Sequence, residues 1–284
     1  MNVSAPASTV ETPSGKDTAY ENFPVGSILL PASLRPHVAA FYAFARAIDD
    51  IADNPDLPAD EKIRRLTGFA EALSGRERDP AYATAHRMRA SLDETGVPPR
   101  HCLDLIAAFK QDATKLRYKD WDDLMSYCIL SAAPVGRYLL DLHGGSCDGY
   151  GPSDALCMAL QVINHLQDCQ ADYRALDRVY LPGDWLAAEG ARIEELNASA
   201  ASPMLRRVID RTLDATAQLM VAARRLPAGL ASRRLAMESG AIVAIADALI
   251  ARLRREDPLV RRVQLGKPAF LVCCLKGALA GFLS

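Results

Sequence analysis

The sequence predicts an all-α protein that forms a single domain. Half of its 284 residues are hydrophobic, which is enough to bury a sizeable core. Only 6% are aromatic, whereas alanine, leucine and arginine are abundant, and these side chains lose little conformational freedom in a helix. Apolar residues recur with helical spacing almost everywhere after residue 33, and runs typical of strands are few.

The expected helices are bounded by prolines and glycines, which favour helix starts and helix ends respectively. The first helix covers 33–53 and stops near Asn54-Pro55, Pro58 opens the second, and Gly75 ends it. A long helix over 121–145 is closed by two glycines. The other helices are expected over 79–96, 98–115, 151–177, 183–190, 202–226, 233–256 and 268–284.

The composition excludes several classes of function. A net charge near −2 gives no basic field for nucleic acid. Neither GxGxxG nor GxxxxGK[ST] occurs, so no Rossmann or P-loop nucleotide site is predicted. The cysteine count is seven, without a CxxC pair, which indicates free thiols in a reducing compartment. A cytoplasmic protein is therefore expected.

Both ends of the chain carry distinct segments. Residues 1–20 are rich in Ser, Thr, Ala and Pro, lack the pattern of a signal peptide, and are expected to form a flexible tail before a domain over 21–284. The final apolar run is interrupted by Lys276. It is either a buried last helix or a segment that contacts a bilayer peripherally, on the inner face of the membrane.

Two of the expected helices carry acids four residues apart. Asp49 and Asp53 lie in one helix, and Asp168 and Asp172 lie in another, so each pair projects from one helix face about a turn apart. Their neighbours are apolar, which indicates buried helices, and buried aspartates are rarely left unpaired. A solvated acidic face is the alternative for either motif alone. Together, the motifs predict a Mg²⁺ site completed by a substrate phosphate.

Other polar residues extend these motifs. Asn164 and Gln161 continue the second acidic stripe, and an amide oxygen also binds Mg²⁺. Arg46 lies one turn before the first acid and either pairs with it or binds a diphosphate oxygen. Tyr42 and Tyr127 lie on apolar faces, where they either pack in the core or line a channel and stabilise a carbocation through their rings.

Three segments carry a resemblance to a known family. "YAFARAIDDIAD", "YCILSAAPVG" and "QVINHLQDCQADYRALDRVYLP" resemble the motifs of the squalene/phytoene synthases, and the similarity covers about residues 20 to 280. The resemblance implies the all-α isoprenoid synthase fold, a helical bundle around a central cavity. It also implies an enzyme that joins two prenyl diphosphates head to head with Mg²⁺.

The resemblance assigns roles to individual residues. The metal ligands, for two or three Mg²⁺ ions, are Asp49, Asp53, Asn164, Asp168 and Asp172. The catalytic residues are the four aspartates of this set with Tyr42 and Tyr127. The residues that contact substrate or its diphosphate are Arg46, Gln161, Arg178, Tyr180 and, from the late basic segment "RRVQLGK", Arg262 and Lys267.

The chain also departs from the family pattern. Gln167 stands where many members have a cation, and Ala171 stands where they usually have Glu, which argues against a complete two-step squalene or phytoene synthase. "YENFPVGSILLP", "NHLQDC" and "DYRALDRVYLP" are most similar to a bacterial branch of hopanoid biosynthesis. Members of that branch take presqualene diphosphate from a sister enzyme and release hydroxysqualene and diphosphate, with water and no nicotinamide.

Three alternatives remain open from the sequence. One is a condensing synthase that converts farnesyl diphosphate to presqualene diphosphate or squalene, or geranylgeranyl diphosphate to phytoene. The others are a non-catalytic assembly factor on the same fold and a plain helical interaction domain with solvated acids.

Overall fold

The computed structural model describes residues 10–11 and 30–284, and the described residues form a bundle of helices with two short strands. The helices are α1 (Arg35–Ala52), α2 (Ala59–Leu73), α3 (Ala83–Thr95), α4 (Arg100–Asp112), α5 (Trp121–Ser131), α6 (Ala133–Leu142), α7 (Tyr150–Leu176), α8 (Gly183–Glu189), α9 (Pro203–Ala223), α10 (Arg233–Leu253) and α11 (Lys267–Leu283). The strands β1 (Arg117–Tyr118) and β2 (Val179–Pro182) pair in parallel. The prediction of an all-α fold is confirmed.

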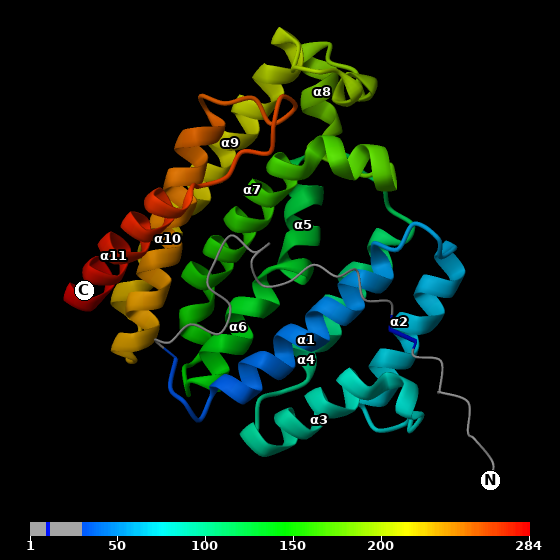
Figure 1. Cartoon of the computed structure of the whole chain (residues 1–284), viewed down its shortest axis with the longest axis vertical. Helices are drawn as coiled ribbons and strands as arrows, with labels where there is room; N and C mark the ends of the chain where they lie inside the picture. Colours follow the sequence, from blue (N-terminus) through cyan, green and yellow to red (C-terminus); the bar gives the residue numbers. More distant parts are fainter. Residues whose placement is uncertain (1–9, 12–29) are drawn as a thin grey trace.

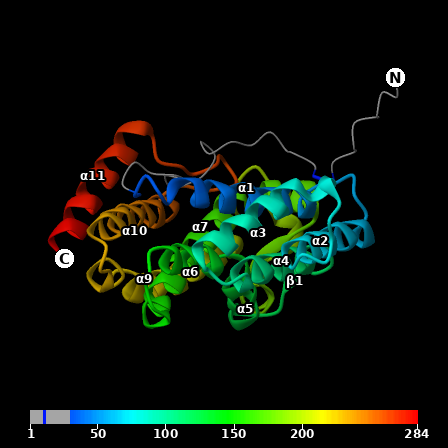
Figure 2. The ribbon, with the colours of Figure 1, turned by 90° about the horizontal axis from the view of Figure 1, so that it is seen from below.

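The bundle has two hydrophobic clusters. One joins buried residues of α5, α7, α9 and α10, and the other joins α1, α2, α3, α4 and α6. In Figure 1, α9, α10 and α11 lie on one side of the central α7, and α1 to α4 lie on the other. Figure 2 shows the same helices from below, with α10 and α11 at one end of the bundle and α2 at the other. The space between the clusters contains the cavity described below.

The expected single helix over 121–145 is wrong. α5 ends at Ser131 and α6 begins at Ala133, with Ala132 at φ −124° and ψ −47° between them. Pro134 explains the break, because a proline has no N–H to donate to the carbonyl four residues earlier and its ring crowds the preceding turn. The break turns α6 away from α5 and allows both helices to line the cavity.

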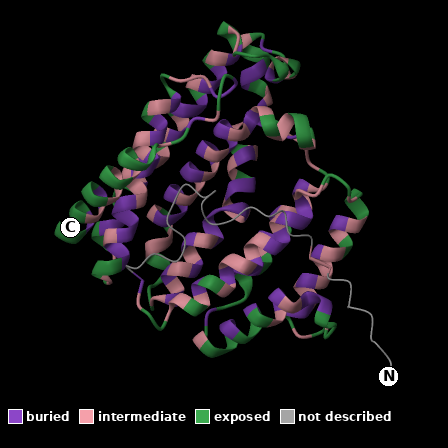
Figure 3. Ribbon diagram, in the orientation of Figure 1, coloured by how far each residue is buried: buried purple, intermediate pink, exposed green. Residues whose placement is uncertain are grey.

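α11 packs on α10 through glycines. A Cβ added at Gly277 would lie 2.2 Å from the carbonyl oxygen of Gly240, and one at Gly281 would lie 2.1 Å from that of Ala236, so the two backbones are in direct contact. The larger side chains of α11 point outward, and Figure 3 shows this helix mostly exposed. The alternative of a buried last helix is therefore wrong. Among the described residues, no helix is both long and apolar enough to span a bilayer.

Only two residues of the predicted N-terminal tail are described. The carbonyl oxygen of Val10 accepts a hydrogen bond from Arg65 of α2 at 3.0 Å. The Glu11 carboxylate accepts hydrogen bonds from the backbone N–H and the hydroxyl of Thr84 in α3. The rest of that prediction lies outside the described residues.

Candidate active site

A cavity of about 380 Å³ lies between the two hydrophobic clusters. Its lining changes along each helix: α1 contributes Val38 and Phe41 near its start and acids near its end. α7 contributes Ser153 and Leu156 before its acids. The C-terminal ends of α1 and α7 meet, because Arg178, just after α7, donates to the carbonyl oxygen of Ala52 at 2.8 Å. The cavity therefore has a polar half and an apolar half.

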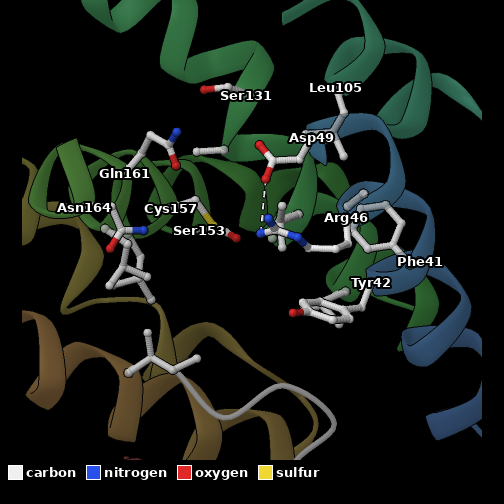
Figure 4. Close-up of a pocket in the computed structure, with 18 of the residues that line it drawn as sticks. Phe41, Tyr42, Arg46, Asp49, Leu105, Ser131, Ser153, Cys157, Gln161 and Asn164 are labelled. Carbon is white, nitrogen blue, oxygen red and sulfur yellow. Dashed lines mark ion pairs between the residues drawn. The ribbon is translucent and has the colours of Figure 1, made fainter. Parts of the chain in front are cut away.

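Both acidic motifs line this one cavity. The five residues assigned as metal ligands, and all the residues assigned to substrate except one, are among those that line it: Tyr42, Arg46, Asp49, Asp53, Tyr127, Gln161, Asn164, Asp168, Asp172, Arg178, Tyr180 and Arg262. Figure 4 shows Tyr42, Arg46 and Asp49 projecting from α1 toward Gln161 and Asn164 of α7. Lys267 is exposed at the start of α11 and does not line the cavity.

Arginines pair with three carboxylates near the C-terminal end of α1. Arg46 lies 3.1 Å from the Asp49 carboxylate, a contact drawn in Figure 4, and 2.6 Å from that of Asp50. Arg178 donates to Asp53 at 2.5 Å. Because an arginine presents the same donors to a carboxylate and to a phosphate, these side chains are able to hold either group.

Asp168 is held by a residue far along the chain. The Nε and Nη2 atoms of Arg262 donate to its two carboxylate oxygens at 2.6 and 3.0 Å. The buried Gln167 side chain donates to the backbone carbonyl of Val263 and so fixes the segment that carries Arg262. Gln167 therefore helps to bring a cation from another segment to Asp168.

The turn after α7 places Arg178. α7 ends at Leu176, and the next residue, Asp177, has a positive φ of 52°, a conformation that aspartate tolerates better than most residues. Arg117 of β1 pairs with the Asp177 carboxylate at 2.6 Å, and the pairing of β1 with β2 continues from there. Arg178 then reaches the last carbonyl of α1, where a cation is favourable because of the helix dipole.

Asp112, the last residue of α4, is a lining residue that the sequence did not indicate. It is 3% exposed, and it accepts hydrogen bonds from the hydroxyls of Tyr127 at 2.6 Å and Tyr180 at 3.4 Å. Burial raises the pKa of Asp112 to about 7, against the opposing effect of nearby Arg178. Burial also holds the pKa of both tyrosines well above the ordinary value, so they remain hydrogen-bond donors.

His165 lies beside this group. Its ring stacks on Tyr180 with centroids 3.6 Å apart, and its Nε2 lies 3.1 Å from the amide nitrogen of Gln161. Burial, with a smaller contribution from Arg178, lowers the pKa of His165 to about 3, so the imidazole is neutral. It therefore adds no cation to the site and supports the position of the two neighbouring side chains.

The donor set of the polar half fits Mg²⁺. Four carboxylates and one amide from two facing helices offer the hard oxygen ligands that this ion prefers. Among the described residues, no three His, Cys, Asp or Glu side chains come close enough together to hold an ion by themselves. A Mg²⁺ ion here would complete its coordination with water and with substrate oxygens, which is its usual behaviour in phosphate sites.

The chain is similar to several known proteins. The squalene/phytoene synthase family matches residues 17–269. A hydroxysqualene synthase of Rhodopseudomonas palustris is 45% identical over 96% of this chain and 92% of its own length, and one of Sinorhizobium fredii is 42% identical over 92% and 88%. The crystal structure of the squalene synthase HpnC from Alicyclobacillus acidocaldarius has a TM-score of 0.71 and 33% identity, over 81% of this chain and 87% of that one. The family match covers nearly all of the described bundle, and two acidic helices face each other across one cavity. The chain belongs to the squalene/phytoene synthase family.

Proposed function

We propose that the protein is a Mg²⁺-dependent hydroxysqualene synthase, which converts presqualene diphosphate and water to hydroxysqualene and diphosphate. The observation that carries the proposal is the division of the cavity. Acids and arginines that suit a metal-bound diphosphate line one half, and apolar side chains that suit a hydrocarbon line the other. The relatives at 42–45% identity are named hydroxysqualene synthases. The catalytic domain is proposed to span residues 21–284.

The acids have a defined part in this reaction. Asp49, Asp53, Asn164, Asp168 and Asp172 would hold two or three Mg²⁺ ions. Bound there, Mg²⁺ acts as a Lewis acid that stabilises the charge of the leaving diphosphate. The three arginines of the polar half would bind diphosphate oxygens, because the donors that now contact carboxylates also suit phosphate.

The apolar half would hold the hydrocarbon and the carbocation. The rings of Tyr42 and Tyr127 line the cavity and are suited to stabilise positive charge through their faces. The lining keeps bulk water out, so that the cation rearranges before water adds. Because water and not hydride ends the reaction, no nicotinamide is required.

The proposal is tested by substrate choice. The purified protein is incubated with Mg²⁺ and without nicotinamide, in separate reactions with presqualene diphosphate and with farnesyl diphosphate. Mass spectrometry identifies the products. Hydroxysqualene from presqualene diphosphate alone is expected. Turnover of farnesyl diphosphate would instead identify a condensing synthase, and inertness toward both substrates would favour a non-catalytic protein.

We also propose that the protein works in the cytoplasm, on the inner face of a membrane, and contacts the bilayer through α11. Six large apolar side chains of this helix are exposed: Leu271, Val272, Leu275, Leu279, Phe282 and Leu283. Residues 258–284 contain Arg261, Arg262, Lys267 and Lys276 and no acid. Exposed apolar residues with flanking cations suit an anionic lipid surface, where a hydrocarbon-bearing substrate from a sister presqualene diphosphate synthase would also reside.

Flotation with vesicles tests this contact. Binding to vesicles that contain an anionic lipid is expected to exceed binding to neutral vesicles. Leu275→Glu is expected to abolish it, because the side chain is 64% exposed on α11 and a charge there opposes insertion. Val221→Glu, at an exposed position of α9, is the control. Equal binding by Leu275→Glu and the unmodified protein would contradict the proposal.

A further inference from the structure

Besides Asp112, one further acid lines the cavity outside both acidic motifs. α10 turns one face toward the cavity, formed by Leu235, Glu238, Ser239 and Ile242 at helical spacing. The remaining acids and arginines that line the cavity come from α1, α4, α7 and the segments after α1, α7 and α10. Glu238 is thus the charged group that α10 contributes, and its neighbours on that face include two large apolar side chains.

The carboxyl of Glu238 is buried, and one of its oxygens has no partner in the described part of the chain. The residue is 6% exposed, and its Oε2 has no hydrogen-bond partner among the described residues. Ser239 does not supply one, because its hydroxyl donates to the carbonyl oxygen of Ala236 at 3.0 Å. Burial raises the pKa of Glu238 to about 7, so near neutral pH the group exists in both protonation states.

An uncompensated acid in an apolar cavity destabilises the fold, since a buried polar group without a partner costs free energy. Such a cost is typical of groups that act on a ligand. The reaction proposed above contains a step that needs a proton acceptor. When water adds to a carbocation, the product oxygen carries an extra proton, and Glu238 is the carboxyl that lies beside the apolar side chains of α10 in the cavity.

We propose that Glu238 is the base that accepts this proton. The carbon–oxygen bond to diphosphate breaks, and its electron pair leaves with diphosphate. After rearrangement, the oxygen of one water forms a bond to the cationic carbon. One proton of that water passes to the Glu238 carboxylate, which becomes a neutral acid, and hydroxysqualene remains. The proton returns to solvent when the product leaves. This inference rests on the proposed hydroxysqualene synthase activity.

The test is the fate of the cation in Glu238→Gln. Glutamine has nearly the same shape and cannot accept the proton. General-base contributions are on the order of 10²–10⁴-fold, so hydroxysqualene formed per presqualene diphosphate consumed is expected to fall by roughly tenfold or more. The cation should instead lose a C–H proton to the released diphosphate and appear as a hydrocarbon. Glu238→Asp, which keeps a carboxyl, is expected to restore part of the hydroxysqualene.

Asp247→Asn is the matched control, because it makes the same acid-to-amide change on α10, at a surface residue paired with Arg224. Its product ratio should equal that of the unmodified protein. Folding is followed by the thermal midpoint of each variant. An unchanged product ratio in Glu238→Gln overturns the proposal, and so does a slower reaction with the same ratio. If the unmodified protein forms no hydroxysqualene, the proposed function itself is refuted. That result is distinct from a failure of the Glu238 proposal, because it is measured without any substitution.

Discussion

Arg262 and Asp168 lie 94 positions apart in the chain, yet they form two hydrogen bonds across the cavity. Gln167, the residue just before Asp168, donates to the backbone carbonyl of Val263 and so positions Arg262. A cation therefore reaches the polar half of the cavity from the segment between α10 and α11.

Arg262→Met is expected to weaken binding of presqualene diphosphate. Hydrogen bonds to charged groups contribute about 1.5–3 kcal/mol, which corresponds to a roughly 10- to 100-fold rise in KM. Arg255→Met is the control, since Arg255 is exposed on the surface and donates to the carbonyl oxygen of Ala251. Steady-state kinetics at saturating Mg²⁺ measure the effect. An unchanged KM in Arg262→Met would show that this arginine serves only to pair with Asp168.

Glu238 is expected to make stability depend on pH. Burial raises its pKa from an ordinary 4.5 to about 7, so the folded protein binds this proton more tightly than the unfolded chain. Its contribution to the free energy of unfolding is therefore present below about pH 4.5 and lost as the pH rises through about 7.

Glu238→Gln removes this dependence. Relative to the unmodified protein, the variant should gain stability between about pH 4.5 and about pH 8, by up to about 3 kcal/mol. Urea unfolding at both pH values measures the difference. If the free energies of unfolding of the variant and the unmodified protein differ by the same amount at both pH values, the Glu238 carboxyl is not buried in the folded protein.

The helices α10 and α11 depend on glycine for their contact. The close approach of Gly240 and Gly277 leaves no room for a methyl group, and α11 has few other buried residues with which to hold its place. Small residues at this contact thus fix the position of a helix whose outer face remains exposed.

Gly277→Ala is expected to lower the free energy of unfolding by about 1–3 kcal/mol, because the new Cβ would lie 2.2 Å from the Gly240 oxygen and 2.6 Å from the Ala241 Cα. Gly229→Ala, in the short 3-10 helix Pro227–Gly229, is the control, since no atom of another segment lies within 4 Å of its added Cβ. That control should be neutral or stabilising by about 0.5–1 kcal/mol. Denaturant unfolding compares them, and equal stabilities would contradict the contact between α10 and α11.

The bundle as a unit was largely predictable from local patterns. Helical spacing gave most of the helices, and acids at steps of four gave two motifs that line one cavity. The break at Ala132 was missed because apolar periodicity continues through Pro134. Asp112 and Glu238 were missed because nothing in their local sequence distinguishes a side chain that faces a cavity from one that faces solvent. The sequence left open whether the last helix is buried or contacts a bilayer, because hydrophobicity alone does not distinguish the two; the structure shows α11 exposed.

The central proposal is that the two acidic motifs lining the cavity hold Mg²⁺ for the reaction. Mg²⁺-dependent turnover of presqualene diphosphate by Asp168→Asn tests it most directly. The acid lies in the polar half of the cavity, whereas Asp210, paired with Arg206 on α9, gives a surface control with the same chemical change. Hydroxysqualene formation should fall roughly 100-fold or more in Asp168→Asn, as when one transition-state contact is removed, and stay near normal in Asp210→Asn. A normal rate with unchanged Mg²⁺ dependence in Asp168→Asn would show that the acids only hold arginines in place, and would contradict the proposed mechanism.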